Sequence, residues 1–301
     1  MIVPDGAMAQ AARAQSEAAA LVHGSLGTLS DLSIWGAGVQ RQCPTSQFSQ
    51  PALIFFVAPG SLMSQQKADD IRNGLGLVGD LAHAQGVRVK VIEAPGDLTD
   101  ALALGRAVVD SEIDAGTDIV IPLLLNDDDF AAAAVIGLFT RSDAAAVTST
   151  SGAQSDAEWM DRCASVRDAM RKGRQVMGDP LEVLASVDAR PLAALVGVLL
   201  QSSARATPAM IDGRDSCAAA LVAQRISRSA TQWWVAASTS SDRAVIRGLD
   251  HLEIPIVTDL HLQNSSGVGA LTALPILQIA MTTLQQLPIV NELTMEQEAE
   301  L

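Results

Sequence analysis

The chain has 301 residues, of which 49% are hydrophobic, 18% charged and only 3% aromatic, so it can bury a large core that must be aliphatic. The formal net charge of −14 argues against nucleic acid or an anionic membrane as a partner, because phosphate groups would be repelled. The shortage of aromatic side chains also argues against a surface on which bases stack.

The sequence has no pattern typical of export or membrane insertion. Residues 1–24 contain early acidic side chains and no apolar stretch long enough for a signal peptide. The longest apolar run, residues 191–200, is well short of a membrane span. The three cysteines, Cys43, Cys163 and Cys217, are far apart and form no CxxC pair, which is typical of reduced packing thiols. We therefore expect a cytoplasmic protein.

In chain order, the pattern first predicts two Ala-rich helices, over residues 5–23 and 25–40. The continuous apolar run 52–57 indicates a buried strand that stops at Pro59-Gly60, and a polar helix is expected over 65–84. The remaining predicted strands are 87–92, 118–125, 145–148, 207–211, 232–237 and 254–258. The remaining predicted helices are 98–114, 129–138, 156–172, one opening at Asp179-Pro180, 192–205, 217–227, 243–251 and one entered at Gly267.

Strands that alternate with helices predict an α/β fold with a Rossmann-like, mostly parallel sheet and helices on both faces. We expect residues 46–266 to form this domain. The first and last segments, residues 1–45 and 267–301, are expected to form a small helical domain. In such sheets, ligands bind outside the carboxyl ends of the strands. The loops that follow these ends are therefore the places to search for a site.

One of these loops is followed by two glycines. Gly267 and Gly269 stand in LQNSSGVGALTALPIL, where a polar loop turns into a long Ala- and Leu-rich helix. Glycines at such a place let the backbone approach a ligand closely, and the free N–H groups of a helix start favour an anion. The loop before them, residues 263–266, contains no acid, base or strong nucleophile.

Several pieces, read in order, resemble one protein family. They are HGSLG (23–27), DPLEVL (179–184), IDG (211–213) and SSGVGALTALPIL (265–277). Their order and spacing are similar to those of the nicotinate mononucleotide:dimethylbenzimidazole phosphoribosyltransferases of cobalamin biosynthesis. The resemblance covers most of the chain. It implies a Rossmann-like α/β domain, a small helical domain, a homodimer and a phosphoribosyl transfer reaction without a bound cofactor.

The chain departs from the family at the residues that carry its chemistry. Ser266 occupies the position of the family's catalytic Glu, which takes a proton from the attacking base. A serine hydroxyl without a neighbouring base cannot take that role near pH 7. Leu124 stands where the family has a second carboxylate. The base-binding stretch that follows the first strand in the family is missing.

The family's glycine-rich nucleotide loop is also replaced, by Asp127, Asp128 and Asp129. Two interpretations of these aspartates remain open. They cap the following helix at its N-terminus, or they hold a Mg²⁺ ion. We expect capping rather than metal binding.

Eight residues match positions that the resemblance assigns to ligand binding, and they are the candidate site: Gly152, Arg162, Asp212, Gly213, Ser216, Ser241, Gly267 and Gly269. Arg162 replaces a phosphate-binding Lys of the family. The glycines and Asp212 are explained either by retained binding or by the needs of backbone turns, and we favour the turns.

Other residues are better explained by packing. Trp233 and Trp234 are expected in a strand, and Cys217 at the start of a helix, where a thiol pKa can fall but burial is the favoured interpretation. A His261–Ser266 catalytic pair would lack an orienting acid other than Asp259.

The leading hypothesis is a pseudoenzyme that has lost the standard transfer but binds a small nucleotide-like or aromatic ligand, or pairs with an active homologue. The alternatives are an active transferase with an altered site and a structural dimer without a ligand.

Overall fold

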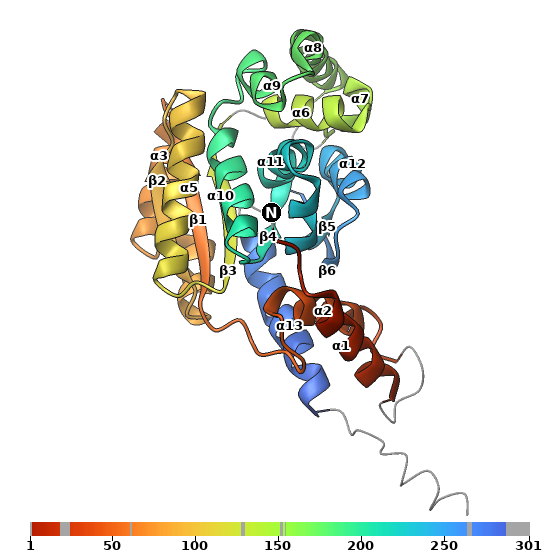
Figure 1. The fold of residues 1–301 in the computed structure, drawn as a ribbon. Helices are drawn as coiled ribbons and strands as arrows, with labels where there is room; N and C mark the ends of the chain where they lie inside the picture. Colours follow the sequence, from red (N-terminus) through yellow and green to blue (C-terminus); the bar gives the residue numbers. More distant parts are fainter. Residues whose placement is uncertain are drawn as a thin grey trace, which may run out of the picture. The chain divides into compact units, whose positions relative to one another are not determined.

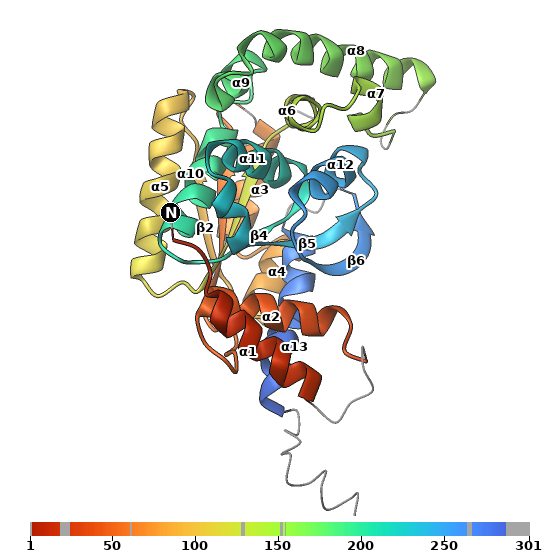
Figure 2. The same ribbon diagram turned by 45° about the vertical axis from the view of Figure 1, so that its right-hand side comes forward.

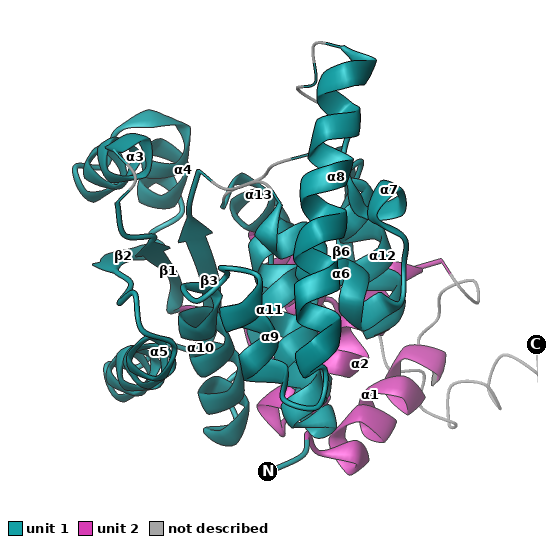
Figure 3. Cartoon of the chain, turned by 90° about the horizontal axis from the view of Figure 1, so that it is seen from above, with its two compact units in different colours: residues 1–3, 50–273 teal, residues 4–49, 274–301 magenta. Residues whose placement is uncertain are grey.

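The computed structural model describes residues 2–18, 25–60, 62–127, 130–150, 153, 155–263 and 267–286. They divide into two compact units, coloured separately in Figure 3. The larger unit comprises residues 1–3 and 50–273, and the smaller one residues 4–49 and 274–301. The division falls within the last helix rather than at residue 267, because the first part of this helix packs on the sheet of the larger unit.

The larger unit contains a six-stranded sheet in the order β2-β1-β3-β4-β5-β6, and all its neighbouring strands are parallel. The predicted parallel α/β fold is therefore confirmed. β1 and β3 are buried along their whole length because their side chains are almost continuously apolar. The strands are β1 (Pro51–Val57), β2 (Arg88–Glu93), β3 (Ile119–Leu125), β4 (Ala209–Ile211), β5 (Trp234–Ser240) and β6 (Ile256–Leu262).

Helices cover both faces of this sheet (Figures 1 and 3). One face carries α3 (Leu62–Arg72), α4 (Gly76–Ala84) and the first turns of α13 (Val268–Gln286). The other carries α5 (Leu98–Asp114), α10 (Leu192–Ala204), α11 (Gly213–Ile226) and α12 (Arg243–Leu252). Glycines let α5 and α10 approach closely, since a Cβ on Gly105 would lie 2.0 Å from the Ala194 carbonyl oxygen.

Between β3 and β4 the described chain forms α10 and, before it, four further α-helices: α6 (Ala131–Thr140), α7 (Ala144–Val147), α8 (Asp156–Gly173) and α9 (Pro180–Ser186). Every residue of α6 from Ala131 to Phe139 is buried, as expected for a helix that is apolar all round. It packs against α8, α11 and α12, and Figure 2 shows it end-on below the long α8.

The smaller unit consists of α1 (Gly6–Ala18), α2 (Thr28–Gln40) and the remainder of α13. Side-chain amides bond the backbone of α13: Gln15 Nε2 donates to the Leu284 carbonyl at 2.8 Å. Within the described chain, α13 is the one helix whose length and hydropathy would suffice to cross a membrane. Half of that stretch is buried in the protein.

Three local predictions are wrong. Residues 145–148 form no strand but part of the short helix α7, because three successive alanines favour a helix. The helix expected over 65–84 is two helices, because Gly74 and Gly76 both adopt positive φ and break it. Trp233 ends a 3₁₀ turn (Arg228–Trp233) instead of lying in β5, although it is fully buried.

We expect Gly267→Ala to destabilise the fold. Gly267 has φ +100°, and an added Cβ would lie 3.1 Å from both Leu123 Cδ1 and Phe55 Cζ. Backbone strain and overpacking should together lower the free energy of unfolding by about 2–4 kcal/mol. Urea denaturation measures this change.

Gly116→Ala is the matched control, because Gly116 has φ +95° and no atom near its added Cβ. It should show the strain alone, about 1–2 kcal/mol. An equal loss in the two variants would mean that the contact with the sheet contributes nothing.

Candidate functional site

The direction in which successive strands are added to the sheet reverses between β1 and β3, and a cavity opens there. From β1 the chain passes through α3 and α4 to β2, and then through α5 to β3 on the other side of β1. In open α/β sheets this switch point is where ligands bind. The cavity has a volume of about 560 Å³, and we call it the switch-point cavity. Its walls come from the loops after β1 and β3 and from the starts of α6, α10 and α11.

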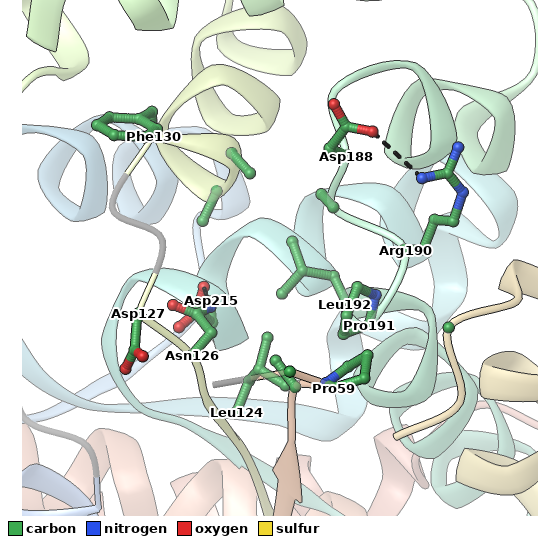
Figure 4. A pocket seen from close by; sticks show the side chains of 16 residues that line it. Pro59, Leu124, Asn126, Asp127, Phe130, Asp188, Arg190, Pro191, Leu192 and Asp215 are labelled. Atoms are coloured by element: carbon green, nitrogen blue, oxygen red, sulfur yellow. Dashed lines mark hydrogen bonds and ion pairs between the residues drawn. The ribbon is translucent and has the colours of Figure 1, made fainter. Parts of the chain in front are cut away.

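The cavity has an apolar floor between two polar ends (Figure 4). The floor consists of Pro59, Leu124, Pro191 and Leu192. Leu124 thus lies on the wall, at the place where the resemblance expects a carboxylate. Among the described wall residues, three are acidic and one is a cation: Asp127, Asp188, Asp215 and Arg190.

The polar ends are held by side-chain hydrogen bonds and an ion pair. Asn126 donates to Asp215 through its Nδ2, at 3.1 Å from the Oδ1 atom. Asp127 accepts a hydrogen bond from Ser64 Oγ at 3.0 Å. Arg190 Nη1 lies 3.2 Å from Asp188 Oδ1, so the guanidinium is already paired with a carboxylate of the same chain. The wall is therefore electronegative overall.

Asp212 lies at the carboxyl end of β4 and holds the start of α13. Its Oδ2 accepts hydrogen bonds from the backbone N–H groups of Gly267 and Ala270, both at 3.1 Å. Asp212 is only 6% exposed. A buried carboxylate at a helix N-terminus satisfies the free N–H groups and interacts favourably with the helix dipole. The N-terminus of α13 is thus capped by the protein itself.

Arg214, Asp215 and Ser216 each bond a different segment of the chain. The bond between Asp215 and Asn126 is described above. Arg214 Nε donates to Asp242 Oδ2 at 2.8 Å, and Nη2 of the same guanidinium contacts that oxygen as well. Asp242, whose side chain is 1% exposed, also caps α12 by accepting from the Ala244 N–H at 2.9 Å. Ser216 Oγ donates to the Pro122 carbonyl in β3 at 3.0 Å.

The structure brings part of the predicted site together. Asp212, Gly213, Ser216, Gly267 and Gly269 meet around the ends of β4 and the start of α13. Gly213 and Gly267 both have positive φ, and Gly267 also contacts the sheet, so backbone turns and packing account for them.

Of the other predicted residues, the structure describes Arg162 and Ser241. Arg162 pairs with Glu158 at 2.6 Å along α8. Ser241 is exposed before α12. Gly152, Ser266, Asp128 and Asp129 lie outside the described residues.

The metal and capping hypotheses concern the loop before α6. The N-cap position of α6 is Phe130, which makes no side-chain capping bond. Among the residues that the structure describes, no group of three His, Cys, Asp or Glu side chains is arranged to hold a metal ion.

The two remaining candidates for reactive side chains differ in burial. Burial raises the pKa of the Cys217 thiol, and the charge of Asp242 raises that pKa further, so Cys217 is a packing residue and not an activated thiol. His261 is largely exposed, with its Nε2 atom 3.5 Å from Asp259 Oδ1.

Sequence reasoning missed the paired cavity residues Asp188 and Arg190, and also Arg214, Asp215 and Asp242. The string DGRDS contains Arg214 and Asp215 and was a usable signal, because polar residues directly after a strand point to the carboxyl edge of a sheet.

Comparison with known proteins decides the family. The model of a phosphoribosyltransferase family matches residues 94–293. A nicotinate-nucleotide–dimethylbenzimidazole phosphoribosyltransferase of Streptomyces avermitilis is 34% identical, over 95% of this chain and 88% of the relative. One from Mycobacterium marinum is 31% identical, over 94% and 91%. The chain belongs to this phosphoribosyltransferase family. The resemblance seen in the sequence is thereby confirmed.

The fold agrees with that of a solved family structure. The enzyme of this name from Thermus thermophilus superposes with a TM-score of 0.86, covering 96% of this chain and 98% of that one, at 19% identity. The alignment with the Streptomyces relative runs over 333 positions, more than the 301 residues here, so the relative contains segments without a counterpart in this chain.

We expect Asp212→Ala to lower the free energy of unfolding by about 2–3 kcal/mol, because two N–H groups at the start of α13 lose a charged acceptor. Asp212→Asn keeps one oxygen acceptor and should lose about half as much. Urea denaturation of both variants tests this order.

Asp188→Asn is the control, because Asp188 is an exposed acid whose ion pair with Arg190 lies on the surface. It should change the stability by less than about 1 kcal/mol. Asp212→Ala at parental stability would show that Asp212 does not hold α13.

Proposed function

We propose that this protein is a divergent phosphoribosyltransferase-family member of cobalamin biosynthesis that is impaired or inactive in the standard transfer, and that it binds a small aromatic ligand in the switch-point cavity. The single observation that carries the proposal is the wall of this cavity, where Asp127, Asp188 and Asp215 stand against one arginine. The two-fold homodimer that the resemblance implies is part of the same proposal.

The charge of the wall disfavours a nucleotide phosphate. At about 5 Å and an effective dielectric constant near 20, each carboxylate–phosphate pair costs roughly 3 kcal/mol. Arg190 offsets little of this cost, because it is already paired with Asp188 at 3.2 Å. The apolar floor around Leu124 and Leu192 suits a flat ring, and the acidic end suits a ring N–H or a cation.

The missing general base supports the same proposal. Ser266 cannot accept the proton of an attacking ring nitrogen near pH 7. Asp212, the buried carboxylate that bonds Gly267, already accepts two backbone hydrogen bonds at the start of α13 and so serves the fold.

The second candidate function is an active transferase that attaches a lower-ligand base through an altered site. It is favoured by the identity of 34% to a relative of that name over 95% of this chain. In this case Asp127 or Asp215, both on the cavity wall, would have to replace the missing base.

Nicotinate release separates the two candidates. With nicotinate mononucleotide and dimethylbenzimidazole, we expect turnover at least about 100-fold below that of the Streptomyces relative, the lower range for loss of a general base. Ser266→Glu should not restore turnover, because the effects of catalytic groups that act together are not additive and one substitution recovers little.

Ser265→Glu is the matched control for a new negative charge in the same loop. Parental turnover within tenfold of the relative would contradict the loss of transfer. Robust turnover by Ser266→Glu alone would show that the rest of the nucleotide site is intact.

Thermal shift tests the ligand. Dimethylbenzimidazole should raise the melting temperature, since a ligand of the native state stabilises it, whereas nicotinate mononucleotide should not. Asp127→Asn removes one carboxylate and should increase the response to the mononucleotide. A larger shift with the mononucleotide than with the benzimidazole in the parent protein would refute the proposed preference.

A further inference from the structure

A second hollow, of about 480 Å³, lies where the C-terminal ends of three helices meet, and we call it the α6 hollow. The helices α6, α11 and α12 pack against one another in the larger unit (Figure 2). Their last turns contribute Arg141, Arg225 and His251 to the wall, and the rest of the wall is Leu138, Phe139, Thr140 and Met177. None of these residues lines the switch-point cavity.

The α6 hollow is cationic in a chain of formal charge −14. Arg141 and Arg225 line it, and none of its described wall residues is acidic. A guanidinium carries five N–H donors. Within the described part of the chain, no side-chain hydrogen bond or ion pair involves either arginine. Cations at helix C-termini are stabilised by the helix dipoles, but this long-range interaction leaves the N–H donors available to a ligand.

Much of the remaining wall of this hollow is apolar. Leu138 and Phe139 are more than nine-tenths buried, and Met177 has an adaptable thioether side chain. A volume of this size suits a small organic molecule. A neighbouring hollow shares Arg225 and His251 but contains Asp250 and Glu253, so an anion is favoured on the α6 side.

We propose that the α6 hollow binds a small organic anion. Arg141 and Arg225 hold its phosphate or carboxylate group, since guanidinium groups match both geometrically. Its apolar or aromatic body packs against Phe139 and Met177. This site is separate from the switch-point cavity and goes beyond the proposed function. The two hollows share α6 and α11, and in both helices the first residues line one hollow and the last residues line the other.

Isothermal titration calorimetry with phenyl phosphate tests the site, with inorganic phosphate and phenol as the two halves of the probe. We expect phenyl phosphate to bind with one-to-one stoichiometry and more tightly than either half. Arg225→Gln and Arg141→Gln should each weaken binding at least about tenfold, the effect of losing a charge-assisted hydrogen bond.

Two variants with the same charge change are the controls. Arg247→Gln lies on α12 outside both hollows, and Arg190→Gln lies in the switch-point cavity. Both should bind phenyl phosphate like the parent. Unchanged melting temperatures without ligand verify that the exposed substitutions leave the fold intact.

Three results would overturn the proposal: no binding by the parent at millimolar phenyl phosphate, an equal loss in Arg247→Gln, or a loss in Arg190→Gln with none in Arg225→Gln. The second would indicate non-specific attraction, and the third would assign the anion to the switch-point cavity.

Discussion

The arrangement of the carboxyl edge of the sheet depends on one short segment, Asp212–Ser216. Asp212 caps α13, Arg214 pairs with the buried Asp242 before α12, Asp215 binds Asn126 after β3, and Ser216 bonds the backbone of β3. β4, which delivers the segment, is only three residues long. Its position is therefore maintained by these charge-assisted bonds as much as by the strand ladder. Removing one partner of such a buried pair leaves an uncompensated charge, which is costly.

At the turn of Gly267 to Gly269, the structural needs of the fold are distinct from the needs of catalysis. Gly267 is needed because its backbone has positive φ and a Cβ at this position would crowd Leu123 and Phe55. Asp212 is needed because it satisfies the N–H groups of α13. Neither requirement involves a substrate. A chain can thus keep this turn for the sake of its fold alone, which is why the glycines are no evidence for retained transfer.

Charge is distributed unequally between the two ends of α6. Its N-terminal residues line a cavity whose described wall contains three carboxylates, and its C-terminal residues line a hollow whose described wall contains two arginines and a histidine. A site for a nucleotide phosphate at the strand ends would need positive charge near the N-terminal end of α6 instead. The proposed preference for a ring in the switch-point cavity and for an anion in the α6 hollow both follow from this distribution.

The sequence by itself determined the elements with continuous local signals. α5 has the predicted bounds, and β1 and β3 lie where apolar runs indicated buried strands, because burial on both faces requires such runs. It also determined the family, through Asp212-Gly213 and the glycine turn. The pairing of Arg214 with Asp242 and the meeting of Arg141, Arg225 and His251 were decided only by the tertiary structure. Contacts between residues distant in sequence depend on the direction in which each helix leaves the sheet, and no local pattern records that direction.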